Sequence, residues 1–312
     1  MHRPRLASFA SPLAGVALFA LAACGGGSGG GGGADGLGAP THSAGWVTTI
    51  RGPGNEYGET LAVFDDGATV VVGEHDAGAV FGPGELLQTT LPAFGSFVAR
   101  YAANGTLAWV KDLPSTPGGY ATGVVAYPDG ACVAAGVLAG PMTFAAGELN
   151  ETTIGTAPIG TWIAKWDSTG GLLFAKEIPT PSDSAFVSLA ARTGGGFVIA
   201  GSFDGAMTLG SGEPNETTLT SADAARDLFV AGYDSAGLLA SAQAAGGTGE
   251  QRAYGVVTLA DGGWTIVGGF ETTITLGDGE PNETTLASTG PADLFIARFA
   301  ANGDLAWARR FG

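Results

Sequence analysis

The strongest constraint on the fold is an internal repeat of about 65 residues that runs through most of the chain. Each copy has one glycine at the end of its second apolar segment and another before its last segment. The first recurs at intervals of 63, 65 and 67 residues, at Gly73, Gly136, Gly201 and Gly268. The second recurs at intervals of 65, 67 and 66 residues, at Gly105, Gly170, Gly237 and Gly303. Such a period indicates a repeat architecture, in which neighbouring units bury each other's apolar faces.

Each repeat predicts four antiparallel strands, which we call a, b, c and d in chain order. Apolar runs alternate with turn signals, and strand c alternates its side chains between two faces, as in Phe97–Tyr101. We expect c–d turns at Asn104-Gly105, Thr169-Gly170, Ala236-Gly237 and Asn302-Gly303. We expect type I′ turns, with positive φ at both central residues, between a and b. These lie at Asp66-Gly67, Asp129-Gly130, Thr193-Gly194 and Asp261-Gly262.

Four-stranded antiparallel units at a fixed long period predict an all-β, β-propeller-like array. Glycine fits this prediction, because 55 of 312 residues is about 18%, against an average near 7%. No segment shows a sustained helical period, which excludes a helical solenoid. The repeat domain covers residues 45–312, with repeats at about 52–113, 114–178, 179–245 and 246–312.

The ends of the repeat domain resemble each other. Trp46-Val-Thr-Thr-Ile50 matches Trp307-Ala-Arg-Arg-Phe311, so the domain opens and closes with a d-type strand. One strand is therefore surplus to four blades. Two arrangements stay open: a closed ring with this strand at an edge, or an incomplete ring from a longer repeat array. The incomplete ring predicts an exposed strand edge or a central gap.

Residues 1–23 have the pattern of a secretory signal peptide. A basic start, Met1–Arg5, precedes an apolar run from Leu13 to Ala23, which is shorter than the roughly 20 residues of a transmembrane helix. Residues 24–44 follow as a Gly-rich segment, and Gly25–Gly33 is glycine apart from Ser28. Chains of this composition are flexible tethers.

Two resemblances add to this pattern. Leu21-Ala22-Ala23-Cys24 resembles the lipobox of bacterial lipoproteins, which implies cleavage before Cys24 and lipidation of its thiol. Asp293–Phe299 followed by Leu305-Ala-Trp307 resembles the SBBP repeats of bacterial β-propellers, although Gly232 and Ser241 depart from that pattern. The resemblances imply a lipid-anchored propeller in the cell envelope, at the outer membrane and facing the periplasm or the cell surface.

The charge limits the partners. Lys and Arg number 13 and Asp and Glu 29, a net charge of −16, and removing Arg3 and Arg5 with the leader gives 11 − 29 = −18. Nucleic acid is excluded as a partner, because such a field repels phosphates. The surface also repels anionic headgroups, so the lipid on Cys24 must hold the protein at the membrane.

No catalytic residue and no cofactor is assigned from the sequence. His75 follows the end of a predicted strand and is interpreted as a solvated loop residue, and Cys132 as a small core residue. No His or Cys cluster has zinc-ligand spacing. Recurrent Glu–Asn pairs in the b–c connection suggest turn-capping asparagines or, alternatively, Ca²⁺ ligands. The pairs are Glu148 and Asn150, Glu213 and Asn215, and Glu280 and Asn282.

We therefore predict a binding or scaffold module rather than an enzyme, with a protein or a glycan as ligand. The alternative is an extracytoplasmic hydrolase that uses carboxylates on one propeller face. Aromatic residues at equivalent repeat positions fit either a sugar-stacking platform or the core between repeats. They are Trp109, Phe174 and Trp307 on strand d, and Tyr101, Trp166, Tyr233 and Phe299 on strand c. The ligand, the envelope face and the oligomeric state are not determined by the sequence.

Overall fold

The computed structural model describes residues 16–20, 45–115, 119–155, 159–180 and 186–312. Within these ranges the regular secondary structure consists of strands and no helices. The strands form eight antiparallel sheets, most of them four-stranded. The prediction of an all-β, β-propeller-like repeat array is confirmed.

Four sheets are the blades of this array, and each runs a, b, c, d from one edge to the other. Blade 1 consists of β3 (Glu56–Val63), β4 (Thr69–His75), β7 (Gly95–Tyr101) and β8 (Leu107–Pro114). Blade 2 consists of β9 (Tyr120–Ala126), β10 (Cys132–Leu138), β13 (Gly160–Trp166) and β14 (Leu172–Pro179). Blade 3 consists of β15 (Phe186–Ala191), β16 (Phe197–Phe203), β19 (Asp227–Tyr233) and β20 (Leu239–Ala245). Blade 4 consists of β21 (Gln251–Thr258), β22 (Trp264–Phe270), β25 (Asp293–Phe299) and β26 (Leu305–Phe311).

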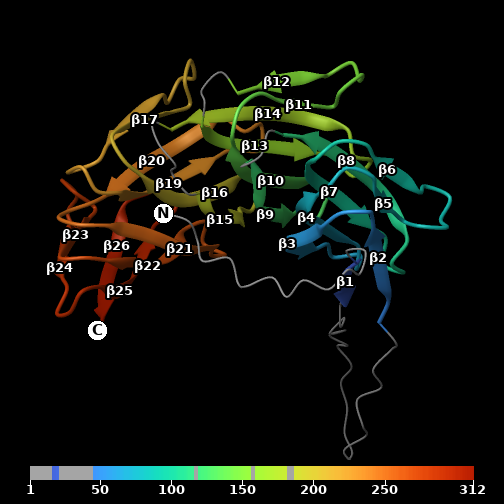
Figure 1. The fold of residues 1–312 in the computed structure, drawn as a ribbon. Helices are drawn as coiled ribbons and strands as arrows, with labels where there is room; N and C mark the ends of the chain where they lie inside the picture. Colours follow the sequence, from blue (N-terminus) through green and yellow to red (C-terminus); the bar gives the residue numbers. More distant parts are fainter. Residues whose placement is uncertain (1–15, 21–44, 116–118, 156–158, 181–185) are drawn as a thin grey trace, which may run out of the picture.

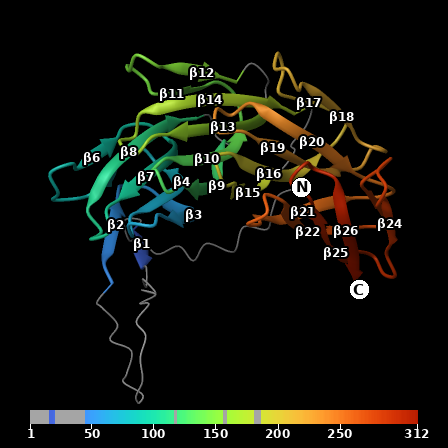
Figure 2. The same cartoon turned by 180° about the vertical axis from the view of Figure 1, so that it is seen from behind.

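The long b–c connection of each repeat forms a short two-stranded arm. The arms are β5 (Ala79–Phe81) with β6 (Thr89–Leu91), β11 (Met142–Phe144) with β12 (Thr152–Ile154), β17 (Ala206–Leu209) with β18 (Thr217–Thr220), and β23 (Thr273–Leu276) with β24 (Thr284–Ala287). Arms 2 to 4 pack against strand d of their own blade and strand d of the preceding blade. They lie on the outside of the array (Figure 2) and link neighbouring blades there.

The blades form an open arc rather than a closed ring (Figure 1). Strand a of each blade packs on the blade before it: β9 on β3 and β4, β15 on β9, and β21 on β15 and β16. In the described ranges, the strands of blade 1 and blade 4 do not pack together. The two end blades are therefore apart, as in the incomplete ring.

The surplus strand β2 (Val47–Arg51) lies beside blade 1. It pairs with that blade's arm at Arg51 and Val80, much as β8 packs against the arm of blade 2. This position is the one expected for a d strand preceding blade 1. Strand β1 (Val16–Ala20) pairs with β2 along its whole length and belongs to the segment predicted as a signal peptide. Cleavage before Cys24 would remove β1.

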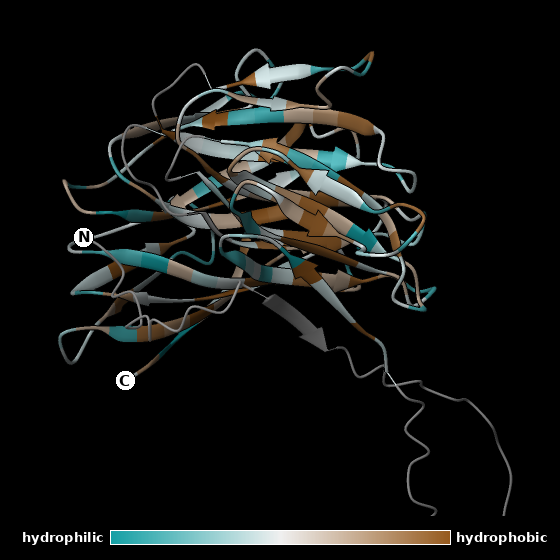
Figure 3. Cartoon of the chain, turned by 45° about the vertical axis from the view of Figure 1, so that its right-hand side comes forward, coloured by the Kyte–Doolittle hydropathy of each residue, from teal (hydrophilic) through white to brown (hydrophobic). Residues whose placement is uncertain are grey.

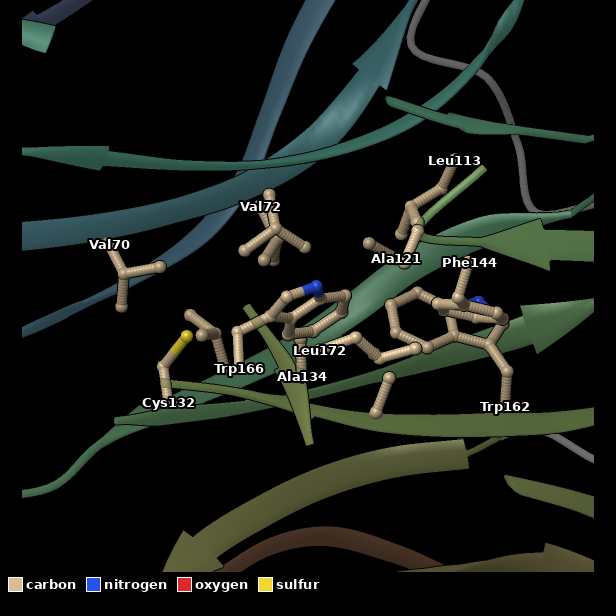
Figure 4. Close-up of a cluster of buried hydrophobic side chains, with 14 of the residues drawn as sticks. Val70, Val72, Leu113, Ala121, Cys132, Ala134, Phe144, Trp162, Trp166 and Leu172 are labelled. Atoms are coloured by element: carbon tan, nitrogen blue, oxygen red, sulfur yellow. The ribbon is translucent and has the colours of Figure 1, made fainter. Parts of the chain in front are cut away.

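The hydrophobic core lies between blades, in a cluster at each junction. At the junction of blades 1 and 2, Trp166 of blade 2 lies next to Val72 of blade 1, and Trp162 packs against Phe144 of the blade 2 arm (Figure 4). Strand c of each of blades 1 to 3 is buried along its full length, because its two alternating faces belong to two different junctions. Figure 3 shows the apolar residues concentrated in the strands of the blades. Blade packing, rather than any single sheet, therefore makes the core.

The a–b turns differ from the predicted type I′ turns. In the first, the Gly67 N–H donates to the Phe64 carbonyl and the Phe64 N–H donates to the Ala68 carbonyl, at 2.9 Å each. Gly67 has φ of +81°, but Asp66 is not among the residues with positive φ. The loop is one residue longer than a type I′ turn, so only the glycine needs the left-handed conformation. In blade 3 the equivalent glycine is Gly195, one residue after the predicted Gly194.

Candidate functional site

The predicted lipidation site, Cys24, lies outside the described residues. Within the described ranges, no helix is long and apolar enough to cross a membrane. The predicted Ca²⁺ ligands all lie in the described arms, so their geometry can be examined directly.

The arm glutamates bind the backbone at the start of strand d. Glu213 Oε2 accepts a hydrogen bond from the Leu239 N–H at 2.6 Å, and Glu85 Oε2 accepts one from the Leu107 N–H at 2.6 Å. In blade 4 the Leu305 N–H donates to Glu280 at 2.5 Å. The carboxylate thus satisfies a backbone donor and fastens the arm to its own blade.

The arm asparagines bind the same leucines from the other side. The amide of Asn215 donates to the Leu239 carbonyl at 2.9 Å, and that of Asn282 donates to the Leu305 carbonyl at 3.0 Å; Asn150 donates to Leu172 in the same way. The prediction that these side chains cap their own turns is wrong, because they reach strand d instead. Among the described residues no three His, Cys, Asp or Glu side chains form a metal-binding group. The Ca²⁺ interpretation stays a prediction.

The arm glutamates also connect neighbouring blades. Lys111 Nζ on strand d of blade 1 donates to Glu148 on the arm of blade 2 at 2.8 Å. Lys176 repeats this contact with Glu213 at 2.5 Å, and Gln243 replaces the lysine opposite Glu280 at 2.8 Å. All three pairs are 37 residues apart, so a constant Lys/Gln-to-Glu spacing was a signal in the sequence that was missed.

A second junction contact joins a cation to the turns of the next blade. Arg100 Nη1 donates to the carbonyls of Gly130 at 2.7 Å and Ser168 at 3.2 Å, in the a–b and c–d turns of blade 2. Lys165 makes the equivalent bonds to Gly195 and Ser235 in blade 3 at 3.1 and 2.9 Å. At the junction of blades 3 and 4, where Gly232 replaces the strand c cation, Arg192 reaches the same turn carbonyls, those of Gly262 and Ala301, at 3.3 Å.

A third junction contact places an aromatic ring of strand d over a turn glycine of the next blade. A Cβ added to Gly237 would lie 2.6 Å from Phe174, and one on Gly170 would lie 3.0 Å from Trp109. Trp46, just before β2, covers Gly105 at 2.6 Å in the same manner. At the last junction Ser241 replaces the aromatic ring. We use the name junction set for three side chains of one blade: the cation that bonds the turn carbonyls of the next blade, the cation that bonds its arm carboxylate, and the aromatic ring that covers its turn glycine.

The outer face of blade 4 carries large apolar side chains on which no other described residue packs. Trp307 is 39% exposed, Val257 58% and Phe311 57%. Val198 of strand b and Val230 of strand c face the next blade at the preceding junction and are fully buried there. In the described part of the chain, blade 4 therefore has an uncovered apolar outer face.

The opposite end face, on blade 1, is partly covered. Ile50 of β2 and Trp46 pack on Tyr101 and Val71, which are buried. Leu61 and Val63 on strand a are exposed, at 38% and 51%. The counterpart of Leu61 in blade 2, Val124, is buried against blade 1. Hence β2 covers the outer half of this face and leaves the inner half open.

A pocket of about 200 Å³ lies between blades 2 and 3. Ile163 and Ile178 supply apolar walls, and Lys176, Glu213 and Tyr233 supply polar groups. The Tyr233 hydroxyl is buried without a hydrogen-bond partner among the described residues, and burial raises its pKa. Both carboxylate oxygens of Glu213 are already bonded, to Lys176 and to Leu239. The pocket therefore lacks a free carboxylate at Glu213 for acid–base chemistry.

His75 is a correction to the sequence analysis. It is the last residue of β4 and is 1% exposed, rather than a solvated loop residue. Its Nε2 lies 3.1 Å from Asp112 Oδ1 and its Nδ1 lies 3.1 Å from the Asp76 carbonyl oxygen. Glu56, across the sheet, is buried without a partner among the described residues, and burial raises the pKa of its carboxyl group. This cluster could not be found from the sequence, because Phe81 of the blade 1 arm covers His75 only in the folded chain.

The recurrent aromatic residues of strand c are core residues: Trp166, Tyr233 and Phe299 lie between blades, and Tyr101 lies between blade 1 and β2. Tyr101, Trp166, Tyr233 and Phe299 are all at most 2% exposed. Phe197 stacks on Tyr233 with ring centroids 4.9 Å apart. These residues do not form a sugar-stacking platform. Cys132 is also buried in the core as expected, and burial raises the pKa of its thiol to about 12.

No family model matches the chain, and the search of curated proteins found no relative. Several solved structures resemble it, including the following two. A protein of unknown function from Bacteroides caccae is 10% identical, with a TM-score of 0.38 and 82% of each chain covered. YCF48 bound to the D1 peptide is also 10% identical, with a TM-score of 0.28 and coverage of 83% of this chain and 82% of that one. The assignment of a propeller-like array stands on the strands of this chain.

Proposed function

We propose that this chain is a lipid-anchored protein of the bacterial cell envelope whose propeller-like array acts as a binding or scaffold module. The observation that carries the proposal is the uncovered face of blade 4, where Trp307 and Phe311 on strand d and Val257 on strand a are exposed. Large exposed apolar patches on a soluble domain mark interaction sites.

The carboxylates of the arms support binding rather than hydrolysis. Glu213 and Glu280 each accept a backbone N–H and contact a side chain of the preceding blade. A general acid or base needs a free oxygen within reach of substrate. These glutamates instead hold arms and blades together. The other carboxylate that lines the pocket between blades 2 and 3, Glu177, accepts a hydrogen bond from the Gly155 N–H at 3.0 Å.

The anchor is proposed from the leader, from Cys24 and from the Gly-rich segment that follows. The resemblance to SBBP repeats, carried by Asp293–Phe299 and Trp307, belongs to the same proposal and places the domain outside the cytoplasm. With a mature charge of −18, the domain is held at an anionic surface by its lipid alone. The outer membrane is the proposed location.

The anchor is tested by metabolic labelling with a palmitate analogue in a bacterial host that processes lipoproteins. We expect label on the wild-type chain, loss of label in Cys24→Ser, and resistance of the labelled protein to extraction with salt. Protease shaving of intact cells then reports the exposed face. Label on Cys24→Ser, or a soluble wild-type protein, would overturn the anchor.

The binding role is tested by a pull-down from envelope extracts with the acylated protein. We expect a bound protein or glycan that Trp307→Ala fails to retain, because this change removes the largest exposed ring of the blade 4 face. Leu149→Ala is the matched control, since Leu149 is fully exposed on an arm tip away from that face. Equal retention by wild type and Trp307→Ala would contradict a binding role for this face.

A further inference from the structure

We propose that the free face of blade 4 docks on blade 1 of a second copy of this chain, head to tail. This inference deepens the proposed binding role by naming its partner. It does not depend on the lipid anchor.

The internal junctions show what such a face binds. Arg100 donates hydrogen bonds to turn carbonyls of the next blade, and Lys111 donates one to the carboxylate on its arm. Trp109 covers its turn glycine. At the next junction Lys165, Lys176 and Phe174 make the same three contacts. The junction set therefore defines the chemistry of the partner surface.

Blade 4 carries a complete junction set that no blade receives. Arg298 occupies the strand c position of Arg100, and within the described residues it contacts Asp261 of its own blade. Trp307 occupies the position of Trp109, and Arg309 that of Lys111; both are exposed. Blade 3, by contrast, has Ser241 and Gly232 at two of these positions. The free end thus matches the first two junctions more closely than the third does.

Blade 1 of a second copy offers the matching acceptors. The carbonyls of Gly67 and Ala103 occupy the turn positions of Gly130 and Ser168. Glu85 occupies the arm position of Glu148, and its carboxylate has no ion pair in the described part of the chain. Gly105 is the turn glycine that Trp307 would cover. Arg309 and Glu85 add opposite charges, which favour this orientation of the two copies.

Trp46 is the obstacle that controls this docking, because it already covers Gly105. Strand β2 behind it has five residues and pairs with the arm of blade 1 only at Arg51 and Val80. It also has Thr48 where strand d of blade 1 has Lys111, so it leaves Glu85 without a cation. We infer that β2 is a displaceable cap and that strand d of the second copy, β26, takes its place.

The test uses sedimentation velocity on the mature chain from residue 24 with Cys24→Ser, over a wide range of protein concentration. We expect Trp46→Ala to associate more tightly than wild type, because it uncovers Gly105. Trp307→Ala and Arg309→Glu are expected to weaken association roughly tenfold or more, as for a central contact of an interface. Leu149→Ala is the control and leaves association unchanged.

The double variant Trp46→Ala/Trp307→Ala has an open acceptor face and no donor ring. It is expected to stay monomeric alone and to form a one-to-one complex with wild type, since this head-to-tail contact is heterologous. Self-association that persists in both Trp307→Ala and Arg309→Glu would overturn the proposal. So would a wild type and a folded Trp46→Ala variant that both stay monomeric at every concentration. If Trp46→Ala fails to fold, a wild type that stays monomeric overturns the proposal. If the wild type associates, Trp307→Ala and Arg309→Glu test whether the contact is the proposed one.

Discussion

Phe174 of blade 2 lies so close over Gly237 of blade 3 that a Cβ on this glycine would be 2.6 Å from the ring. The ring thereby fixes the distance between a strand of one blade and a turn of the next. The same relationship joins Trp46 to Gly105 and Trp109 to Gly170. Glycine is required there for two reasons, a left-handed backbone and the absence of a side chain.

These two reasons can be separated with a matched pair of glycines. Gly237 and Gly212 both have φ of +77°, but nothing lies within 4 Å of a Cβ on Gly212. We expect Gly212→Ala to lower the free energy of unfolding by about 1–2 kcal/mol through backbone strain. Gly237→Ala adds an overpacking cost of about 1–3 kcal/mol. Urea unfolding of both variants measures the difference, and equal losses would contradict the contact with Phe174.

The Lys176–Glu213 contact predicts that substituting Glu213 destabilises the fold more than substituting Lys176. Glu213→Ala leaves the Leu239 N–H without its acceptor and leaves Lys176 with the Gly237 carbonyl alone, so we expect the free energy of unfolding to fall by about 1–3 kcal/mol. Lys176→Gln is expected to lose less than about 1 kcal/mol, as for a surface pair, because Gln243 fills the equivalent position and bonds Glu280. Chemical denaturation of the two variants checks this order; a larger loss for Lys176→Gln would contradict the role of Glu213 as the shared acceptor.

Asp227 predicts a pH dependence of stability. Burial raises the pKa of its carboxyl group from 3.8 to about 6. The folded state therefore binds this proton more tightly than the unfolded state, and its stabilising effect is lost as pH rises from 3.8 through about 6. We expect Asp227→Asn to remove this part of the dependence. The measurement is the melting temperature of wild type minus variant across that range, and a flat difference would contradict the raised pKa.

Asp293 occupies the equivalent register position in blade 4 and predicts the opposite sign. The Thr289 N–H bond, followed by the contacts with Arg310, lowers the pKa of its carboxyl group below 3.8. Its contribution is therefore present above 3.8 and is lost as pH falls through its folded pKa. Asp293→Asn is expected to lower the melting temperature near neutral pH and to have less effect in acid. An effect that grows in acid would show that the sign is wrong.

Cys132 is expected to be unreactive in the folded protein. Its thiol is buried and its pKa is raised to about 12 by that burial, so almost no thiolate is available at neutral pH. With Cys24→Ser, iodoacetamide should modify Cys132 only after unfolding in urea. Mass spectrometry before and after denaturation tests this, and rapid modification of the native chain would place Cys132 outside the core.

The sequence predicted the strands well because their signals are local. Turn glycines such as Gly105 and Gly170 end each strand, and alternating residues such as Phe97 and Ala99 mark each face. Each of these local signals recurs in all four repeats, which makes the pattern easier to recognise. The a–b turn type was predicted wrongly, because a loop one residue longer satisfies the same Asp-Gly signal.

The contacts between blades could not be predicted in the same way. Phe174 meets Gly237, and Arg100 meets Ser168, across 60 or more residues, and nothing near either residue identifies its partner. The burial of His75 depends on Phe81 of the blade 1 arm and Phe97 of strand c, which lie against it only in the folded chain. The constant spacing of 37 residues from Lys111 to Glu148 was the one available signal.

The central claim is that the four blades form an open arc in which the end faces of blades 1 and 4 do not pack on each other. At the internal junctions, strand a residues such as Val125 and Leu189 share one core cluster, and Val257 and Leu61 hold the equivalent positions on the two end faces. The most direct test is oxidation of the double variant Leu61→Cys/Val257→Cys in a Cys24→Ser background, at high dilution, followed by mass spectrometry. The open arc predicts no disulfide within one chain, because a disulfide needs Cα atoms within about 7 Å of each other. Rapid formation of that intramolecular disulfide in the monomer would contradict the open arc.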